Sequence, residues 1–275
     1  MSPRNVLVTG GAGFVGSNLA IRHKEHHPDS RVTALDNLKR RGSELNLPRL
    51  RQAGVEFVHG DIRNREDLAG LEAGLILECS AEPSVLAGYS SSPEYLLDTN
   101  LSGTLNCLEL ARRRSADFVF LSTSRVYPIQ ALGGLRYTEQ ETRFVLENEQ
   151  PYPGASAHGI AEEFPLAGAR SLYGATKLAS EMFVEEYGAA FGLRTVVNRC
   201  GVITGPWQMG KVDQGVFALW VARHYFGGEL SYLGYGGTGK QVRDLLHVDD
   251  LYELIDHQAH DPGLFDGGTF NVGGG

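Results

Sequence analysis

Residues 5–16 read NVLVTGGAGFVG, an apolar run that ends in a cluster of glycines. Asn5–Thr9 has the composition of a buried β-strand, and apolar residues at helical spacing follow in Phe14–His27. A glycine-rich turn between a strand and a helix can bind a dinucleotide, because the backbone comes close to the pyrophosphate and the helix points its free N–H groups at it. The spacing fits GxGxxG read from Gly11 and GxxGxxG read from Gly10, and the sequence leaves both open.

An acidic residue stands where such a site contacts the ribose. Asp36 follows the second predicted strand, Arg31–Leu35, and lies 20 residues after Gly16. A carboxylate there hydrogen-bonds the ribose 2′-hydroxyl and repels a 2′-phosphate, which favours NAD over NADP. The basic run Lys39-Arg40-Arg41 favours NADP if it binds a 2′-phosphate, but has no such role if it is a solvated loop. We expect NAD, because Asp36 occupies the ribose-contacting position.

Strand and helix signals alternate along the first 200 residues, which predicts an α/β fold with a Rossmann-like, doubly wound parallel sheet. Residues 128–168 interrupt this rhythm with prolines and glycines, and we expect a long loop region there. Asp249 is the expected N-cap of a late helix. The other predicted strands are Val55–His59, Gly74–Cys79, Asp117–Ser122, Arg194–Asn198 and Thr269–Gly275, and the other predicted helices are Pro93–Arg114, Ser171–Gly192 and Asp213–Phe226.

The composition excludes several classes of protein. Of 275 residues, 42% are hydrophobic and 21% are charged, which is typical of a globular chain. A net charge of −8 argues against binding to nucleic acid or to an anionic membrane. There is no apolar run of transmembrane length and no signal-peptide pattern, and the three cysteines are widely spaced, so we expect a cytoplasmic protein without a metal cluster. We assign no metal to the histidines near residue 26, which suit the dipole at a helix end.

Tyr173 and Lys177 form a second constellation, because residues four apart on a helix lie on one face. A nearby ammonium and a positively charged nicotinamide would lower the pKa of the phenol, and Tyr173 could then exchange a proton with a sugar hydroxyl. A surface Tyr–Lys pair without function has the same spacing. The stretch Leu121–Ser124 favours the catalytic interpretation, because it places hydroxyl groups at the carboxyl end of a predicted strand, where ligands bind in such sheets.

Taken together, TGGAGFVGSNL, Gly60-Asp61-Ile62, LSTSRVY and YGATK resemble the extended short-chain dehydrogenase/reductase superfamily over essentially the whole chain. The resemblance implies that Thr123, four residues before Tyr127, is catalytic, with Tyr173 as base and Lys177 on the cofactor ribose. It also implies a pyrophosphate turn, an adenine-contacting pair and a cofactor loop after the fourth strand. The implied cofactor-binding residues are Gly10, Gly13, Phe14, Val15, Asp36, Asn37, Asp61, Ile62, Ala81, Tyr173 and Lys177.

The stretch Thr123-Ser124-Arg125 separates two reactions of this superfamily. Its nucleotide-sugar dehydratases carry Thr-Asp-Glu here, and their two carboxyl groups eliminate water. This chain has no carboxylate at those positions, so the resemblance points to epimerisation or simple oxidoreduction.

The last segment, Gln241–Asp250, resembles the RDxxHVxD stretch of the superfamily. Three others, Glu82–Val85, Ser171–Gly174 and Asn198–Gly215, resemble the CDP-paratose 2-epimerase (CDP-tyvelose epimerase) group. The resemblance implies an NAD-dependent nucleotide-sugar epimerase, an isomerase that oxidises sugar carbon 2 transiently and returns the hydride to the other face. A guanidinium in the last segment would clamp the diphosphate of a nucleotide diphosphate sugar, with a CDP-sugar expected. The expected substrate contacts are Glu82, Ser124, Arg125, Asn198, Lys211, Gln214 and Arg243.

Two alternatives stay open, a nucleotide-sugar 4-epimerase and a non-catalytic NAD-binding sensor or scaffold. We expect residues 1–170 to form the NAD-binding domain, with 171–200 returning to it and 201–275 forming a smaller substrate-binding lobe. Members of the superfamily normally continue past the segment that ends this chain, so we expect that lobe to be incomplete. The resemblance also implies a homodimer or homotetramer.

Overall fold

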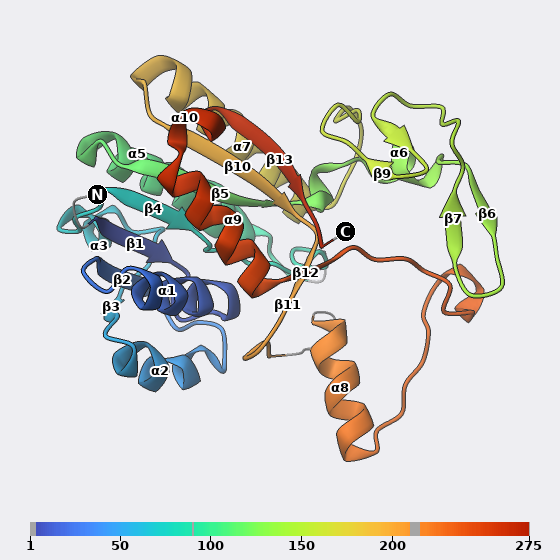
Figure 1. The fold of residues 1–275 in the computed structure, drawn as a ribbon, viewed down its shortest axis with the longest axis horizontal. Coiled ribbons are helices and arrows are strands. Elements are labelled where there is room, and N and C mark those ends of the chain that lie inside the picture. Colours follow the sequence, from blue (N-terminus) through green and yellow to red (C-terminus); the bar gives the residue numbers. More distant parts are fainter. Residues whose placement is uncertain (1–3, 90, 210–214, 275) are drawn as a thin grey trace.

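The computed structural model describes residues 4–89, 91–209 and 215–274. Its centre is a parallel sheet of seven strands in the order β13-β10-β5-β4-β1-β2-β3 (Figure 1). This order confirms the predicted Rossmann-like, doubly wound sheet. The strands are β1 (Asn5–Thr9), β2 (Arg31–Asp36), β3 (Glu56–His59), β4 (Leu75–Glu78), β5 (Asp117–Thr123), β10 (Thr195–Cys200) and β13 (Gly268–Val272).

Alternate residues of the central strands serve two separate cores, because successive side chains point to opposite faces of a sheet. In β5, Val119 and Leu121 pack on one face, and Phe118 and Phe120 pack on the other. The first face is covered by α1 (Phe14–His26), α2 (Leu47–Gln52) and α9 (Val248–His260), and the second by α3 (Arg65–Ala69), α5 (Gly103–Arg114) and α7 (Leu172–Phe191). Both faces are therefore buried, as a parallel sheet requires.

The predicted helix over Pro93–Arg114 is divided by a wider turn. α4 (Glu94–Leu97) runs through a π-helical stretch, Asp98–Ser102, into α5. Asn100 in this stretch accepts a hydrogen bond from the Glu82 N–H at 2.8 Å and donates to the Glu82 carbonyl at 3.2 Å. The turn thus fixes the loop that follows β4. π-helical turns are frequent at functional sites.

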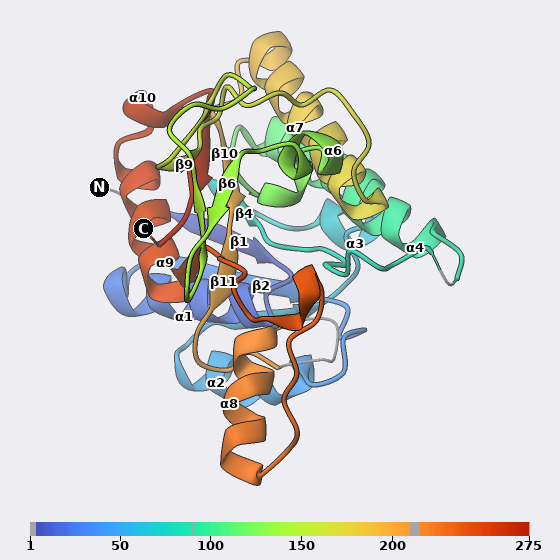
Figure 2. The same ribbon diagram turned by 90° about the vertical axis from the view of Figure 1, so that its right-hand side faces the viewer.

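Residues 128–168 contain more structure than the expected loop. They form α6 (Ile129–Gly133) and two antiparallel hairpins. α6 and the second hairpin pack on a small core that includes Tyr127 and Phe164. The whole segment lies beyond the carboxyl ends of the sheet strands (Figures 1 and 2). The hairpins pair β6 (Tyr137–Glu139) with β7 (Phe144–Leu146), and β8 (Ala155–Ser156) with β9 (Gly159–Ile160).

The predicted division at residue 201 does not follow the sheet, because α9 and β13 return to it near the end of the chain. Between β10 and α9, the described residues 201–209 and 215–247 lie outside the seven-stranded sheet, and α8 (Val216–Phe226) has no buried residue. The expected N-cap at Asp249 is wrong by two residues, since the His247 side chain accepts the Asp249 N–H at 3.2 Å. The remaining short elements are β11 (Val202–Thr204), β12 (Leu245–His247) and α10 (Pro262–Phe265), and the 3₁₀ turns Ser43–Asn46, Ser124–Val126 and Tyr235–Gly237.

No helix within the described residues has both the length and the apolar character that a membrane span requires. The longest one, α7, carries a buried lysine and a buried glutamate on the face that packs against the sheet. Its N-terminus is fixed by Ser171, whose side chain accepts the Gly174 N–H at 3.1 Å. This cap sets where the Tyr173–Lys177 turn begins relative to the end of β5.

Candidate active site

The glycine turn between β1 and α1 is shaped by close backbone contacts. Gly10 has φ +62°, and a Cβ on it would lie 3.0 Å from the backbone of Cys79 and Ser80. A Cβ on Gly11 would lie 2.6 Å from the Ala34 Cβ. A side chain at either position would clash, so the turn requires both glycines. Because both are present, the sequence fits GxGxxG read from Gly11 and GxxGxxG read from Gly10. Gly13 is the N-cap of α1, and no side chain caps this helix.

An uncapped helix N-terminus beside a tight glycine turn suits an anion. The first N–H groups of a helix have no intrahelical partner and carry the positive end of its dipole. In α1 these groups belong to Phe14 and Val15. The turn can therefore hold a pyrophosphate through backbone atoms alone.

The carboxylate at the end of β2 is held against this turn. Asp36 accepts the Ala12 N–H at 3.1 Å and the Leu38 N–H at 2.8 Å. Burial raises the pKa of Asp36, and these backbone hydrogen bonds partly offset that effect. A carboxylate has about four acceptor sites, so acceptor capacity remains for a ribose hydroxyl.

The next strand contributes a second acid. Asn37 donates to Asp61 at 2.8 Å, and Arg63 also binds this carboxylate, at 2.6 Å. Burial alone would raise the pKa of Asp61, but the hydrogen bonds from Arg63 and Asn37 lower it to about 2. Asp61 is therefore ionised over the whole physiological range of pH.

A cavity of about 390 Å³ lies at the carboxyl ends of β1, β2 and β4 and joins these groups. Its lining also contains Lys39, whose ammonium lies 4.1 Å from the centre of the Tyr95 ring. The glycine cradle, the acid at the end of β2 and the position at the strand ends fit a dinucleotide. Of the predicted cofactor and substrate residues, the lining includes Gly10, Gly13, Asp36, Asn37, Asp61, Ile62, Ala81 and Glu82.

The predicted catalytic residues meet at the end of β5. Thr123 is the last residue of this strand, and its hydroxyl accepts the Arg125 N–H at 3.2 Å. The Tyr173 side chain hydrogen-bonds Thr123. A Cβ on Gly174 would overlap the Arg125 carbonyl, so the glycine in YGATK lets α7 approach β5 closely enough for this contact.

Lys177 is nearly fully buried, with 2% of its side chain exposed. Its ammonium donates to the Leu121 carbonyl at 3.0 Å and lies 3.6 Å from Glu78 Oε2. Burial raises the pKa of Tyr173 to about 12, although the Thr123 hydrogen bond acts to lower it. Burial thus outweighs the lowering of the Tyr173 pKa that was expected from the Lys177 ammonium, which is paired with Glu78.

Sequence reasoning missed Glu78, which is fully buried at the end of β4. Its other oxygen accepts the Ser80 N–H at 3.1 Å. A glutamate that ends the apolar strand Leu75–Glu78 was the available signal. A buried charge requires a buried partner, and Lys177 on the other side of β5 provides it.

A second buried pair, Arg199 with Glu181, was also missed. The guanidinium donates to Glu181 Oε2 at 2.8 Å and to the Tyr127 hydroxyl at 3.2 Å. Glu181 lies one turn after Lys177 on α7 and accepts a short hydrogen bond from Ser122. This network ties α7 to β5 and β10 directly beneath the Tyr173 turn.

The predicted substrate residues are scattered. Ser124 and Arg125 are exposed at the end of β5, and Arg243 is exposed with its guanidinium bonded to Val242 and Gln241. Asn198 is fully buried, and its amide pairs reciprocally with Gln258 at 2.8 and 2.9 Å, which argues against a substrate contact. Lys211 and Gln214 lie outside the described residues.

Comparison with known proteins identifies this class of site. Residues 6–273 match the NAD dependent epimerase/dehydratase family, and the chain belongs to that family: it is an NAD-dependent enzyme. The chain is 34% identical to a CDP-paratose 2-epimerase of Salmonella typhi over 98% of its own length and 78% of the relative.

Solved structures carry the same fold. One is a dTDP-glucose 4,6-dehydratase from Bacillus anthracis in complex with NAD, with a TM-score of 0.75 and 28% identity over 98% of this chain and 75% of that one. Another is a UDP-glucose 4-epimerase from Thermotoga maritima with UDP-glucose, with a TM-score of 0.71 and 27% identity over 98% and 76%. A dehydratase and an epimerase thus share the scaffold of this chain.

Proposed function

We propose that this enzyme is a nucleotide-sugar 2-epimerase, an isomerase that acts on a CDP-sugar in the manner of its CDP-paratose 2-epimerase relative. The observation that carries the proposal is the Thr123–Tyr173 hydrogen bond at the end of β5, followed by Ser124 and Arg125. Thr123 and Tyr173 suit proton exchange with a sugar hydroxyl. Elimination of water would need carboxylates at the positions that Ser124 and Arg125 occupy.

In this proposal the protein's own groups move a proton and hold the sugar. NAD, when bound, supplies the acceptor and later the donor of a hydride. Tyr173 takes the proton of the carbon 2 hydroxyl as the C–H bond breaks and the ketone forms. The keto sugar then rotates so that its other face receives the hydride, and Tyr173 returns the proton to the carbon 2 oxygen. Thr123 orients the reacting oxygen, and no net oxidation occurs.

The raised pKa of Tyr173 makes the phenol a proton donor at neutral pH until a positive charge is added nearby. Lys177 is one source of that charge if its ammonium turns from Glu78 toward a bound ribose. The cofactor itself would rest on Gly10, Gly13, Phe14, Val15, Asp36, Asn37, Asp61, Ile62 and Ala81.

The nucleotide sugar would extend from the end of β5 toward residues 128–168, which lie beyond the strand ends (Figure 1). We assign sugar contacts to Glu82, Ser124 and Arg125, and a diphosphate contact to Arg243, a geometry suited to a guanidinium. Asn198 is not retained in this set. The roles of Lys211 and Gln214 rest on the sequence alone.

The proposal is tested with CDP-paratose deuterated at carbon 2, incubated in ordinary water with no added NAD. We expect the carbon 2 epimer to form with its deuterium retained, because the same hydride leaves and returns. Loss of deuterium to water would instead indicate abstraction of a carbon-bound proton and would contradict the mechanism.

A 4-epimerase is the second candidate, favoured by the UDP-glucose 4-epimerase structure that shares this fold. It would use the same Thr123, Tyr173 and Lys177 and differ in the carbon that faces the nicotinamide. Inversion at carbon 4 in the product, read by proton NMR, would select it. NAD binding with no change in any sugar would favour a sensor or scaffold.

We also propose a homodimer or homotetramer. Met182 and Phe183 on α7 are 62% and 41% exposed, and Leu97 on α4 is 40% exposed, so these neighbouring helices present apolar side chains to solvent. Light scattering should give at least twice the monomer mass. A monomer mass would reject this assembly.

A further inference from the structure

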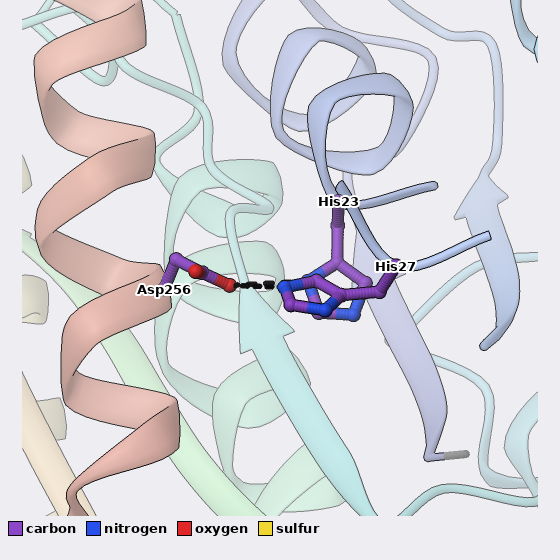
Figure 3. A group of neighbouring side chains, drawn as sticks. All are labelled: His23, His27 and Asp256. Atoms are coloured by element: carbon purple, nitrogen blue, oxygen red, sulfur yellow. Dashed lines mark hydrogen bonds and ion pairs between the residues drawn. The ribbon is translucent and has the colours of Figure 1, made fainter. Parts of the chain in front are cut away.

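A cluster of histidines lies on the opposite end of α1 from the glycine turn. His23 on α1 and His27 at its C-cap point toward Asp256 on α9 (Figure 3). His27 Nε2 lies 2.7 Å from Asp256 Oδ1, and His23 Nδ1 lies 4.0 Å from the same atom. His260, one turn after Asp256, places its Nδ1 at 3.4 Å from that oxygen.

The cluster leaves one ligand atom without a partner. Asp256 Oδ1 is paired with His27 Nε2 and with the Tyr252 hydroxyl, which donates to it at 3.3 Å. His260 Nδ1 is also paired, at 2.7 Å from the Asp256 carbonyl. His23 is 6% exposed, and its Nε2 is buried without a hydrogen-bond partner.

We propose that His23, His27 and Asp256 bind a zinc ion. Tetrahedral zinc with bonds of about 2.0–2.2 Å keeps its ligand atoms roughly 3.3 Å apart. The distances of 2.7 Å from His27 Nε2 and 4.0 Å from His23 Nδ1 to Asp256 Oδ1 lie on both sides of that value. The ligand atoms of His23, His27 and Asp256 all lie within 4.8 Å of one another, so small side-chain movements complete the site.

The pairing of two helices explains what such an ion would do. His23 and His27 are four residues apart, so the end of α1 supplies two ligands from one face, and α9 supplies Asp256. The ion would join the end of α1 to α9, the helix that precedes α10 and the last strand, β13. At 1.5 Å per residue the site lies roughly 20 Å from the glycine turn, so its role is to stabilise and not to catalyse.

The test is isothermal titration of Zn²⁺ into the untagged protein after dialysis against a chelator. We expect one equivalent to bind and to raise the melting temperature. The variant His27→Gln/Asp256→Asn should lose affinity by about tenfold or more, since even partners of metal ligands matter to that extent. His257→Gln is the matched control, because His257 is on the same helix but packs against Phe265.

Co²⁺ gives a second readout that needs no variant. Bound in place of zinc, it should show the intense visible absorption of a tetrahedral site. A weak octahedral spectrum would overturn the proposal. So would the absence of a one-equivalent phase, or equal Zn²⁺ binding by the double variant when circular dichroism shows it folded.

Discussion

At the residue scale, the candidate site depends on buried charges that are paired across strands. The sequence predicted Tyr173 and Lys177 together, because helical spacing is a local property. It did not predict Glu78, since this partner comes from β4 and meets Lys177 only when the sheet has formed. Local pattern therefore identified the catalytic candidates but not the buried environment that sets the pKa of Tyr173.

Tyr173→Phe should lower kcat by roughly 10²–10⁴-fold and leave NAD binding unchanged, because only the exchangeable proton is removed. Turnover by NMR and NAD affinity by fluorescence check the two parts. Tyr187→Phe is the matched control on the same helix, since its hydroxyl donates to Glu109 away from Thr123. Equal rates in Tyr173→Phe and the parent enzyme would remove the proposed proton carrier.

Glu78→Ala should reduce the free energy of unfolding by about 3–5 kcal/mol, because it leaves the Lys177 ammonium buried and unpaired. Urea denaturation measures the change. Glu139→Ala breaks the exposed pair with Lys240 and should cost at most about 1 kcal/mol. Similar losses in the two variants would mean that the buried pair has no special role.

His23 predicts a particular dependence of stability on pH. Its pKa is lowered to about 4 by burial and by the neighbouring His27, so between pH 4 and 6.5 the unfolded chain binds one more proton. The contribution of neutral His23 to the free energy of unfolding is therefore complete above pH 6.5. It is lost as the pH falls toward 4, with a slope of about 1.4 kcal/mol per pH unit. With a chelator present, His23→Gln should flatten this slope in urea denaturation, and an exposed control, His158→Gln, should not.

At the scale of elements, the glycine turn was the most predictable part of the molecule. Its strand, turn and helix follow from one continuous stretch, and the bounds of β1 agree with the prediction. The late helix was less predictable at its start, because His247 caps it in place of Asp249. The π-helical turn within the helix over 93–114 left no signal in the pattern, since it arises where Asn100 bonds the loop after β4.

Gly16→Ala should abolish detectable NAD binding and cost about 1–3 kcal/mol of stability. A Cβ there would lie 2.9 Å from the Gly11 Cα and even closer to Gly10, so the turn must change shape. Calorimetric NAD titration and urea denaturation measure both effects. Gly70→Ala has no atom within 4 Å of its Cβ and should change neither; NAD binding retained in Gly16→Ala would contradict this geometry.

At the scale of the whole molecule, the parallel sheet followed from the alternation of elements, but the domain division did not. The predicted lobe over 201–275 is not one unit in the structure. Its last part, α9 and β13, packs back onto the sheet through long-range contacts. Two described segments leave the sheet, 128–168 beyond the strand ends and 215–247 (Figure 1), and the Phe144 N–H of the first donates to the Lys240 carbonyl of the second at 3.0 Å. The Rossmann layer thus presents the cofactor residues, and these two segments form the side on which we place the sugar.

The central claim is that this chain inverts carbon 2 of a CDP-sugar with NAD retained in the site. Proton NMR of CDP-, GDP- and UDP-sugars incubated with the purified protein and no added NAD tests it most directly. We predict a carbon 2 epimer from a CDP-sugar and from neither of the other two classes. Inversion at another carbon, or no change in any sugar even after NAD is added, would contradict the claim.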